Sequence, residues 1–209
     1  MSRAMRLAAY HHRFVPGAGA PPLLLLHGTG GDENDLLPFG RELFPASPLL
    51  APRGDVSEGG APRFFRRFAE GEFDLEDVRR RATALAAFIA AAAQQYHFDA
   101  RRLTAVGFSN GANMAAILLQ VHPEALAGGI LFRPMVVLDE PAAAGSLDGR
   151  RALLVNGTRD PIVPNDHPAR LATLLGAGGA DVTVTRVAAG HGLTPADIAA
   201  AKSWLPRGD

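Results

Sequence analysis

The chain has 209 residues, a length that suits one compact domain with a sizeable core, and we expect a single domain over residues 1–209. It carries 21 basic and 21 acidic residues, and this zero net charge argues against electrostatic binding to nucleic acid or to an anionic membrane. The sequence contains no cysteine, which excludes disulfides, thiolate metal sites and a cysteine nucleophile.

Short apolar runs along the chain predict six β-strands. Most of these runs are unbroken rather than alternating, as expected for strands that are buried on both faces of a parallel sheet. The predicted strands cover residues 23–26, 47–51, 103–108, 129–132, 152–155 and 182–187.

Stretches with helical spacing lie between these strands. Apolar residues recur at intervals of three and four from Leu75 to Ile89, which predicts the longest helix. Thr194 can cap the last predicted helix, Pro195 suits its first turn, and Asp197 favours its positive end. The helices after the first are expected at about 110–121, 166–175 and 195–204.

Strands that alternate with helices predict a doubly wound, mostly parallel α/β sheet with right-handed crossovers. Ligands of such sheets bind outside the carboxyl ends of the strands. Two irregular stretches, 52–73 and 134–150, could cover a binding site as a lid or could be plain connections. The arginine clusters at 63, 66, 67 and at 79–81 are expected to form solvated surface.

The sharpest motif is Gly107-Phe108-Ser109-Asn110-Gly111, which directly follows a predicted strand and directly precedes a helix. This is the G-x-S-x-G nucleophile elbow in the strand-turn-helix setting that it requires, and it is typical of the α/β-hydrolase fold. The glycines leave room for a tight turn that projects the hydroxyl of Ser109 above the sheet. A glycine-rich turn without any chemistry is the alternative interpretation.

A serine hydroxyl is a weak nucleophile without a base and a residue that orients the base. Asp160 follows a later predicted strand, and His191 follows the final one, so the chain order Ser-Asp-His is that of this fold. The other acidic and histidine residues are worse candidates, because they lie in helices, near the N-terminus or away from strand ends. We therefore predict Ser109 as nucleophile, His191 as general base and Asp160 as the residue that orients the histidine.

Residues 27–31, His-Gly-Thr-Gly-Gly, come right after the first apolar strand. Acyl transfer creates a negatively charged oxygen, which preorganised backbone N–H groups stabilise by hydrogen bonds. We assign these donors to Thr29 and Asn110, and we expect His27 to shape the loop and not to act as a base. A phosphate-binding loop is the competing interpretation, but neither of the two common phosphate-loop motifs is present.

Together with residues 131–135, 160–164 and 190–191, these motifs resemble the phospholipase/carboxylesterase family of α/β hydrolases, which includes acyl-protein thioesterases. The Phe-Arg-Pro-Met and Phe-Ser-Asn-Gly segments look closer to its bacterial subgroup associated with hydroquinone resistance. The resemblance implies cofactor-free hydrolysis of small esters or thioesters. It also suggests that Phe132, Arg133, Met135, Arg63 and Phe64 lie near the substrate, although packing would explain them equally well.

These observations predict a serine carboxylesterase that hydrolyses small esters through an acyl-enzyme, without cofactor or metal. An acyl thioesterase or lysophospholipase is the alternative within enzymes, and a catalytically silent ligand-binding protein is the alternative from another class. A metal-dependent hydrolase is a third, but no H-E-x-x-H motif occurs. No secretory signal is visible, so a cytoplasmic location is the default expectation, and a homodimer is the common oligomeric default.

Overall fold

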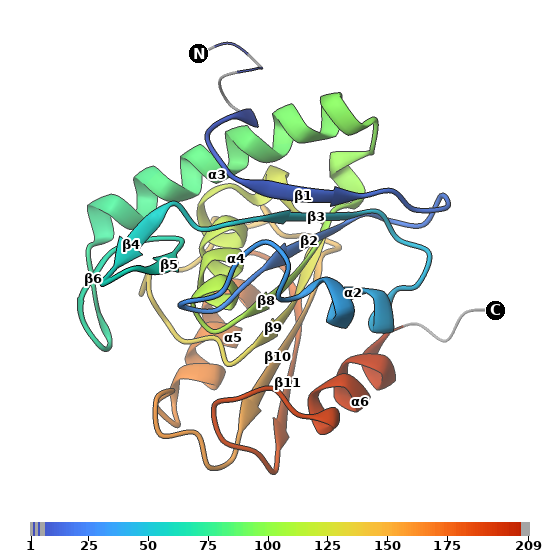
Figure 1. Cartoon of the computed structure of the whole chain (residues 1–209). Helices are drawn as coiled ribbons and strands as arrows, with labels where there is room; N and C mark the ends of the chain where they lie inside the picture. Colours follow the sequence, from blue (N-terminus) through green and yellow to red (C-terminus); the bar gives the residue numbers. More distant parts are fainter. Residues whose placement is uncertain (1, 3, 5–6, 206–209) are drawn as a thin grey trace.

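A seven-stranded sheet forms the centre of the protein, whose computed structural model describes residues 2, 4 and 7–205. The strands follow the order β1-β3-β2-β8-β9-β10-β11 (Figure 1). Neighbouring strands are parallel except for β1, which pairs antiparallel with β3. The strands are β1 His12–Val15, β2 Leu23–Leu26, β3 Leu49–Pro52, β8 Thr104–Phe108, β9 Gly128–Phe132, β10 Arg151–Gly157 and β11 Asp181–Val187. The predicted mostly parallel α/β sheet is confirmed.

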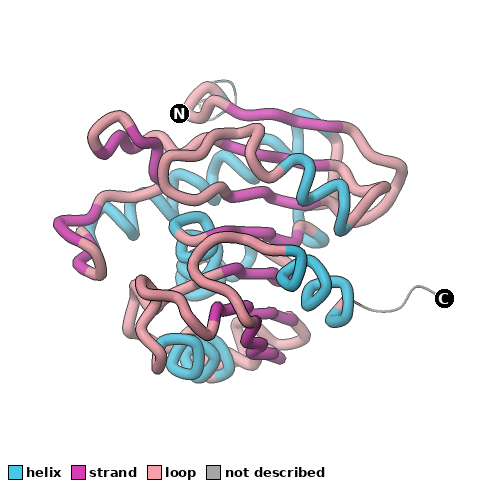
Figure 2. Tube along the Cα trace, turned by 60° about the horizontal axis from the view of Figure 1, so that its bottom comes forward, coloured by secondary structure: helices cyan, strands magenta, loops and turns pink. Residues whose placement is uncertain are grey.

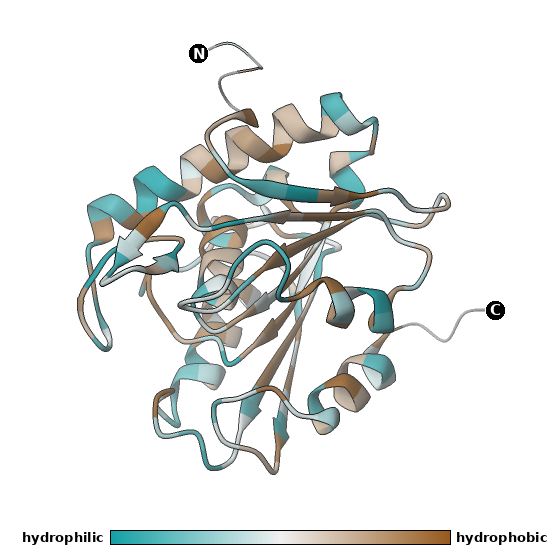
Figure 3. Cartoon of the chain, viewed as in Figure 1, coloured by the Kyte–Doolittle hydropathy of each residue, from teal (hydrophilic) through white to brown (hydrophobic). Residues whose placement is uncertain are grey.

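Helices cover both faces of this sheet (Figure 2). On one face pack α3 Leu75–Tyr96, α4 Asn110–Val121 and α5 His167–Gly176, and on the other pack α2 Leu37–Leu43 and α6 Pro195–Trp204. The leucine run of β2 shows why its sequence does not alternate. Leu24 and Leu26 enter the core of the first face, while Leu23 and Leu25 enter that of the second. The strands in the middle of the sheet are accordingly mostly apolar (Figure 3).

The predicted helices and strands all form, with ends shifted by a few residues. Among the strands of the main sheet and the α-helices that pack on it, α2 and β1 were not predicted. α2 has only seven residues and contains Pro38 and Gly40, and β1 is an edge strand that begins with His12 and Arg13, so neither carries a clear apolar pattern. Two short 3-10 helices cover Ala100–Arg102 and Pro123–Ala125. None of the described helices is long and apolar enough to cross a lipid bilayer.

The irregular stretch 52–73 folds into two small hairpins that stand at the left edge of Figure 1. One pairs β4 Val56–Glu58 with β5 Ala61–Arg63, and the other pairs β6 Arg67–Ala69 with β7 Glu72–Phe73. Phe64 and Phe65, between the hairpins, are buried in the core and anchor this segment. The expectation of a solvated arginine cluster is wrong for Arg63, which is only 2% exposed.

Candidate active site

Ser109 lies at a sharp turn between β8 and α4. Its backbone has φ +50° and ψ −115°, a conformation that residues with a side chain rarely adopt. The surroundings also leave no room for side chains at the flanking positions. A Cβ at Gly107 would lie 2.7 Å from the backbone of α4, and a Cβ at Gly111 would lie 2.1 Å from the carbonyl oxygen of Leu26. The two glycines are therefore required for the turn that presents Ser109.

His191 and Asp160 reach Ser109 from two other loops. Asp160 follows β10, and His191 lies between β11 and α6. His191 Nε2 lies 2.8 Å from Ser109 Oγ, and its Nδ1 lies 2.9 Å from Asp160 Oδ2. An ionised carboxylate only accepts hydrogen bonds, so the ring proton belongs on Nδ1 and Nε2 is free to accept from the hydroxyl. The three residues form one continuous hydrogen-bonded line.

The backbone fixes the direction of the Asp160 carboxylate. Its Oδ1 accepts from the N–H groups of Ile162 and Val163 at 2.8 and 3.3 Å, and its side chain is 2% exposed. The other oxygen is thereby presented to His191. The histidine side chain is 20% exposed, so its ring remains within reach of a bound molecule.

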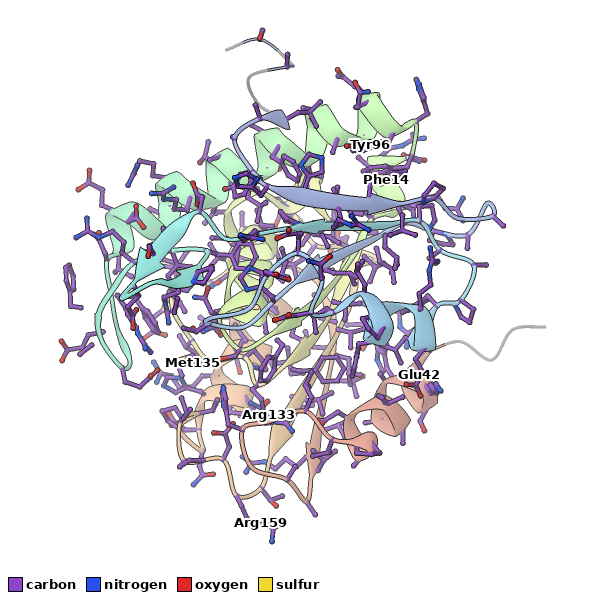
Figure 4. The ribbon with its side chains drawn as sticks, viewed as in Figure 1. Phe14, Glu42, Tyr96, Arg133, Met135 and Arg159 are labelled. Carbon is purple, nitrogen blue, oxygen red and sulfur yellow. The ribbon has the colours of Figure 1, made fainter. Side chains whose placement is uncertain are left out.

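Arg133 lies beneath the loop that carries His191. The side chain is fully buried, on a backbone with φ +58°. Its Nε donates to the carbonyl of Gly190 at 2.9 Å, and its terminal nitrogens donate to the carbonyls of Val155 and Gly192, each at 3.1 Å. Gly190 and Gly192 flank His191 in the chain. One guanidinium therefore holds both sides of the loop that positions the imidazole. Figure 4 labels Arg133 in the lower half of the molecule.

Asp197 is the charged partner of Arg133. It accepts from both terminal nitrogens at 2.6 and 3.0 Å, and neither side chain is exposed. Its carboxylate also accepts from the backbone N–H and the hydroxyl of Thr194, at 2.8 and 2.9 Å. The predicted start of α6 is confirmed, with Thr194 before the helix and Pro195 in its first turn. The pattern did not indicate that Asp197 also links this helix to the His191 loop.

His27 shapes the loop that follows β2, as expected. The ring is buried, its Nδ1 donates to the carbonyl of Gly28 at 2.7 Å, and its Nε2 accepts from the N–H of Gly54 at 2.9 Å. Burial lowers the pKa of His27 below its ordinary value of 6.5. Protonation would place a second donor against the Gly54 N–H, so the neutral ring suits this structural position.

A pH-dependent loss of stability is expected from His27. Its pKa is lower in the folded state, so the unfolded state takes up the proton first as the pH falls below about 6.5. The contribution of His27 is thus complete above this pH and is lost below it. We expect His27→Gln to unfold more easily at pH 8, by about 1–3 kcal/mol, because a buried hydrogen bond is disturbed.

Urea unfolding at pH 8 and at pH 5.5 measures this effect. His27→Gln should lose less stability between the two pH values than the unaltered protein, whereas His11→Gln, at an exposed histidine, should lose the same amount. An unchanged pH dependence in His27→Gln would contradict the expected linkage.

Thr29 and Asn110 line the same cavity as Ser109. Within the described part of the chain, neither backbone N–H has a hydrogen-bond acceptor, and that of Asn110 belongs to the first turn of α4, where no helical partner exists. Both residues are held through their side chains. Arg63 Nη1 donates to Thr29 Oγ1 at 2.6 Å, and the N–H of Phe64 donates to Asn110 Oδ1 at 2.8 Å.

The cavity beside Ser109 has a volume of about 220 Å³. Of the predicted substrate contacts, Arg63 and Met135 line it, and Met135 lies on the side of the hairpins in Figure 4. The cavity lining does not include Phe132, Phe64 or Arg133, whose buried side chains pack in the core or hold loops.

Sequence reasoning missed several lining residues. Three come from the second hairpin, which makes the stretch 52–73 one wall of the cavity, whereas only Met135 comes from the stretch 134–150. Proximity to the serine motif could have indicated two others, Phe108 and Asn113. The lining residues that were missed are Arg67, Glu70, Phe73, Phe108, Asn113 and Ile162.

No family model matches the chain, but individual proteins do. It is 40% identical over 193 residues to a Bacillus subtilis (strain 168) protein named as a hydrolase, MhqD, and the match covers 92% of this chain and 96% of that protein. The crystal structure of a Bacillus cereus carboxylesterase superposes with a TM-score of 0.91 at 40% identity, covering 98% of each chain. A carboxylesterase from Mesorhizobium loti superposes with a TM-score of 0.87 at 33% identity, covering 94% of each chain.

These relatives match nearly the whole chain, and the motifs that carry the resemblance lie around the cavity described above. The fold of this chain superposes on the folds of the two carboxylesterases over 94–98% of its length. The chain is a hydrolase that belongs to the phospholipase/carboxylesterase family of α/β hydrolases.

Proposed function

We propose that the protein is a serine carboxylesterase that hydrolyses small carboxylic esters through an acyl-enzyme on Ser109. The observation that supports this most directly is the hydrogen-bonded line from Ser109 Oγ through His191 to Asp160, with distances of 2.8 and 2.9 Å. This line begins at a serine whose strained turn borders an open cavity.

In the first stage, Ser109 Oγ attacks the ester carbonyl while His191 Nε2 takes the hydroxyl proton. Asp160 stabilises the imidazolium that forms. The carbonyl oxygen becomes negatively charged, and the free N–H groups of Thr29 and Asn110 are the donors proposed to meet it. The C–O bond then breaks, and the imidazolium returns its proton to the departing alcohol.

In the second stage, a water molecule gives a proton to His191 and attacks the acyl carbon. The same N–H donors meet the second oxyanion. Collapse breaks the bond to Ser109 Oγ, which recovers its proton from the imidazolium, and the carboxylic acid leaves. The Arg133 contacts to Gly190 and Gly192 keep the ring in place through both stages.

The size of the cavity favours short acyl chains. Pockets that enclose drug-sized ligands measure roughly 300–1,000 Å³, whereas this cavity measures about 220 Å³. Long-chain thioesters and lysophospholipids, the substrates of the alternative activities, would leave much of their chain outside it. We therefore favour small esters over these substrates.

Two measurements test the proposal. A fluorophosphonate reacts only with an activated serine, so mass spectrometry should locate one adduct on Ser109; no adduct would favour a silent binding protein. In a series of p-nitrophenyl esters, kcat/KM should fall steeply beyond short acids. A rate that rises up to twelve-carbon acids would instead favour the thioesterase or lysophospholipase alternative.

A further inference from the structure

A nearly buried cation forms part of the cavity wall. The side chain of Arg63 is 3% exposed and lines the cavity. A guanidinium has five N–H donors. Arg63 uses one for Thr29 Oγ1 at 2.6 Å and one for the carbonyl of Phe65 at 3.3 Å. No described residue accepts a hydrogen bond from the other three, and a buried charged donor without an acceptor is unfavourable.

Two asparagines lie in this wall, and one of them adds a further donor. Asn110 and Asn113 both line the cavity and are buried. The Oδ1 atoms accept from the backbone N–H groups of Phe64 and Met135, each at 2.8 Å, which fixes the orientation of both amides. The remaining polar atom of each side chain is an NH2 group, which only donates. That of Asn110 has no partner among the described residues, but its nitrogen is itself buried, so the NH2 group of Asn113 is the one that can reach a ligand.

The carboxylates near this wall lie at its solvent side. Glu58 is 3.3 Å from Arg63 Nε but is 41% exposed and also binds Arg67. Glu70, which lines the cavity and pairs with Arg67, is 53% exposed. Glu58 pairs with Arg63 only from the Nε side of the guanidinium, so the Nη2 end keeps N–H groups without an acceptor among the described residues. The positive charge of Arg63 therefore lies inside the cavity, while the negative charges lie at its rim.

We infer that the cavity accepts an ester whose acyl or alcohol part carries a second, ionised carboxylate, bound by Arg63 with the amide group of Asn113. This inference rests on the proposed function and names its substrate class. A carboxylate only accepts hydrogen bonds, and its planar pair of oxygens matches the guanidinium fork.

Pairs of substrates with nearly the same shape test whether a carboxylate on the substrate is recognised. Monoethyl succinate and ethyl succinamate differ only by a carboxylate in place of a carboxamide on the acyl side. Acetoxyacetate and 2-acetoxyacetamide make the same comparison on the alcohol side. We expect kcat/KM to favour the carboxylate of at least one pair by roughly 10- to 100-fold, the range of a charge-assisted hydrogen bond. Equal values in both pairs would overturn the inference.

Variants separate recognition from support of the Thr29 loop. Arg63→Gln should remove the preference for the carboxylate, because kcat/KM should fall further for the charged ester than for the amide. Arg66→Gln is the matched control, because Arg66 is an exposed arginine of the same segment and does not line the cavity. This control should keep the full preference. If Arg63→Gln lowers kcat/KM by the same factor for the charged ester and for the amide, Arg63 only holds the Thr29 loop and the inference is wrong.

A binding measurement avoids dependence on turnover. Calorimetry with Ser109→Ala should detect binding of monoethyl succinate at least 10-fold more tightly than binding of ethyl succinamate, and Arg63→Gln in that background should abolish the difference. Equal binding of the two would overturn the inference. The proposed function fails separately, because the unaltered protein would then hydrolyse neither member of either pair and would give no fluorophosphonate adduct on Ser109.

Discussion

Replacing Ser109 with alanine is expected to lower kcat for p-nitrophenyl acetate by about 10⁴- to 10⁶-fold, the loss found when a triad nucleophile is removed. The reason is that no described atom can replace Oγ at 2.8 Å from His191 Nε2. The Thr29 and Asn110 N–H groups would remain and would supply only residual catalysis over water.

The protein should stay folded in this variant, because the change removes one partly exposed hydroxyl. Near-ultraviolet circular dichroism checks the fold, and Ser203→Ala, at an exposed serine of α6, is the matched control with unchanged activity. A folded Ser109→Ala protein that retains a tenth of the original rate would refute the assignment of the nucleophile.

Arg133→Met is expected to have the largest effect on stability. It leaves Asp197 as a buried charge without its partner and removes the donors to the carbonyls of Gly190, Gly192 and Val155. Breaking one side of a buried ion pair destabilises a protein by about 3–5 kcal/mol. For a chain of this length each kcal/mol lowers Tm by about 2–4 °C, so a fall of roughly 6–20 °C should appear in thermal unfolding.

A control distinguishes this ion pair from ordinary arginine contacts. Arg150 also donates to backbone carbonyls, those of Leu126 and Ser146, but has no carboxylate partner among the described residues and does not line the cavity. Arg150→Met should therefore cost less stability and leave kcat unchanged. An equal fall of Tm in the two variants would show that the pair with Asp197 contributes nothing special.

The role of Arg133 in positioning His191 has its own readout. Arg133→Lys keeps the charge but cannot bond Asp197 and both flanking carbonyls at once. Assayed well below its Tm, this variant should show a lower kcat with an unchanged KM, because the loop that it loosens carries His191 and no proposed binding group. A change in KM alone would contradict this role.

The hydrogen bonds of Arg133 and the strained backbone of Ser109 are connected through the end of β9. A backbone with φ +50° at Ser109 is unfavourable by about 1–3 kcal/mol and persists only where its surroundings hold it. Here the Ser109 N–H donates to the carbonyl of Phe132, directly before Arg133. The nucleophile turn and the histidine loop are thus fixed from neighbouring residues at the end of β9.

Much of this protein could be read from its sequence, because the relevant signals are local. The unbroken run Leu23–Leu26 indicated a strand buried on both faces, and the glycines around Ser109 indicated a turn with no room for side chains. Asp160 and His191 could be chosen since parallel strands bring their carboxyl ends to one edge of a sheet. Periodicity and turn chemistry act over a few residues, so they are visible without a structure.

The parts that the sequence could not decide depend on packing between distant segments. Nothing local distinguishes Arg133, which is fully enclosed and bonded, from Arg63, which has free donors on the cavity, or from the exposed Arg66. The burial of Arg133 and its choice of partners arise only when the end of β9, the loop that carries His191 and α6 come together. The sequence by itself determined the fold class and the choice of Ser109, His191 and Asp160. The tertiary structure alone decided that Arg133 holds the loop of His191 and that Arg63 faces the cavity.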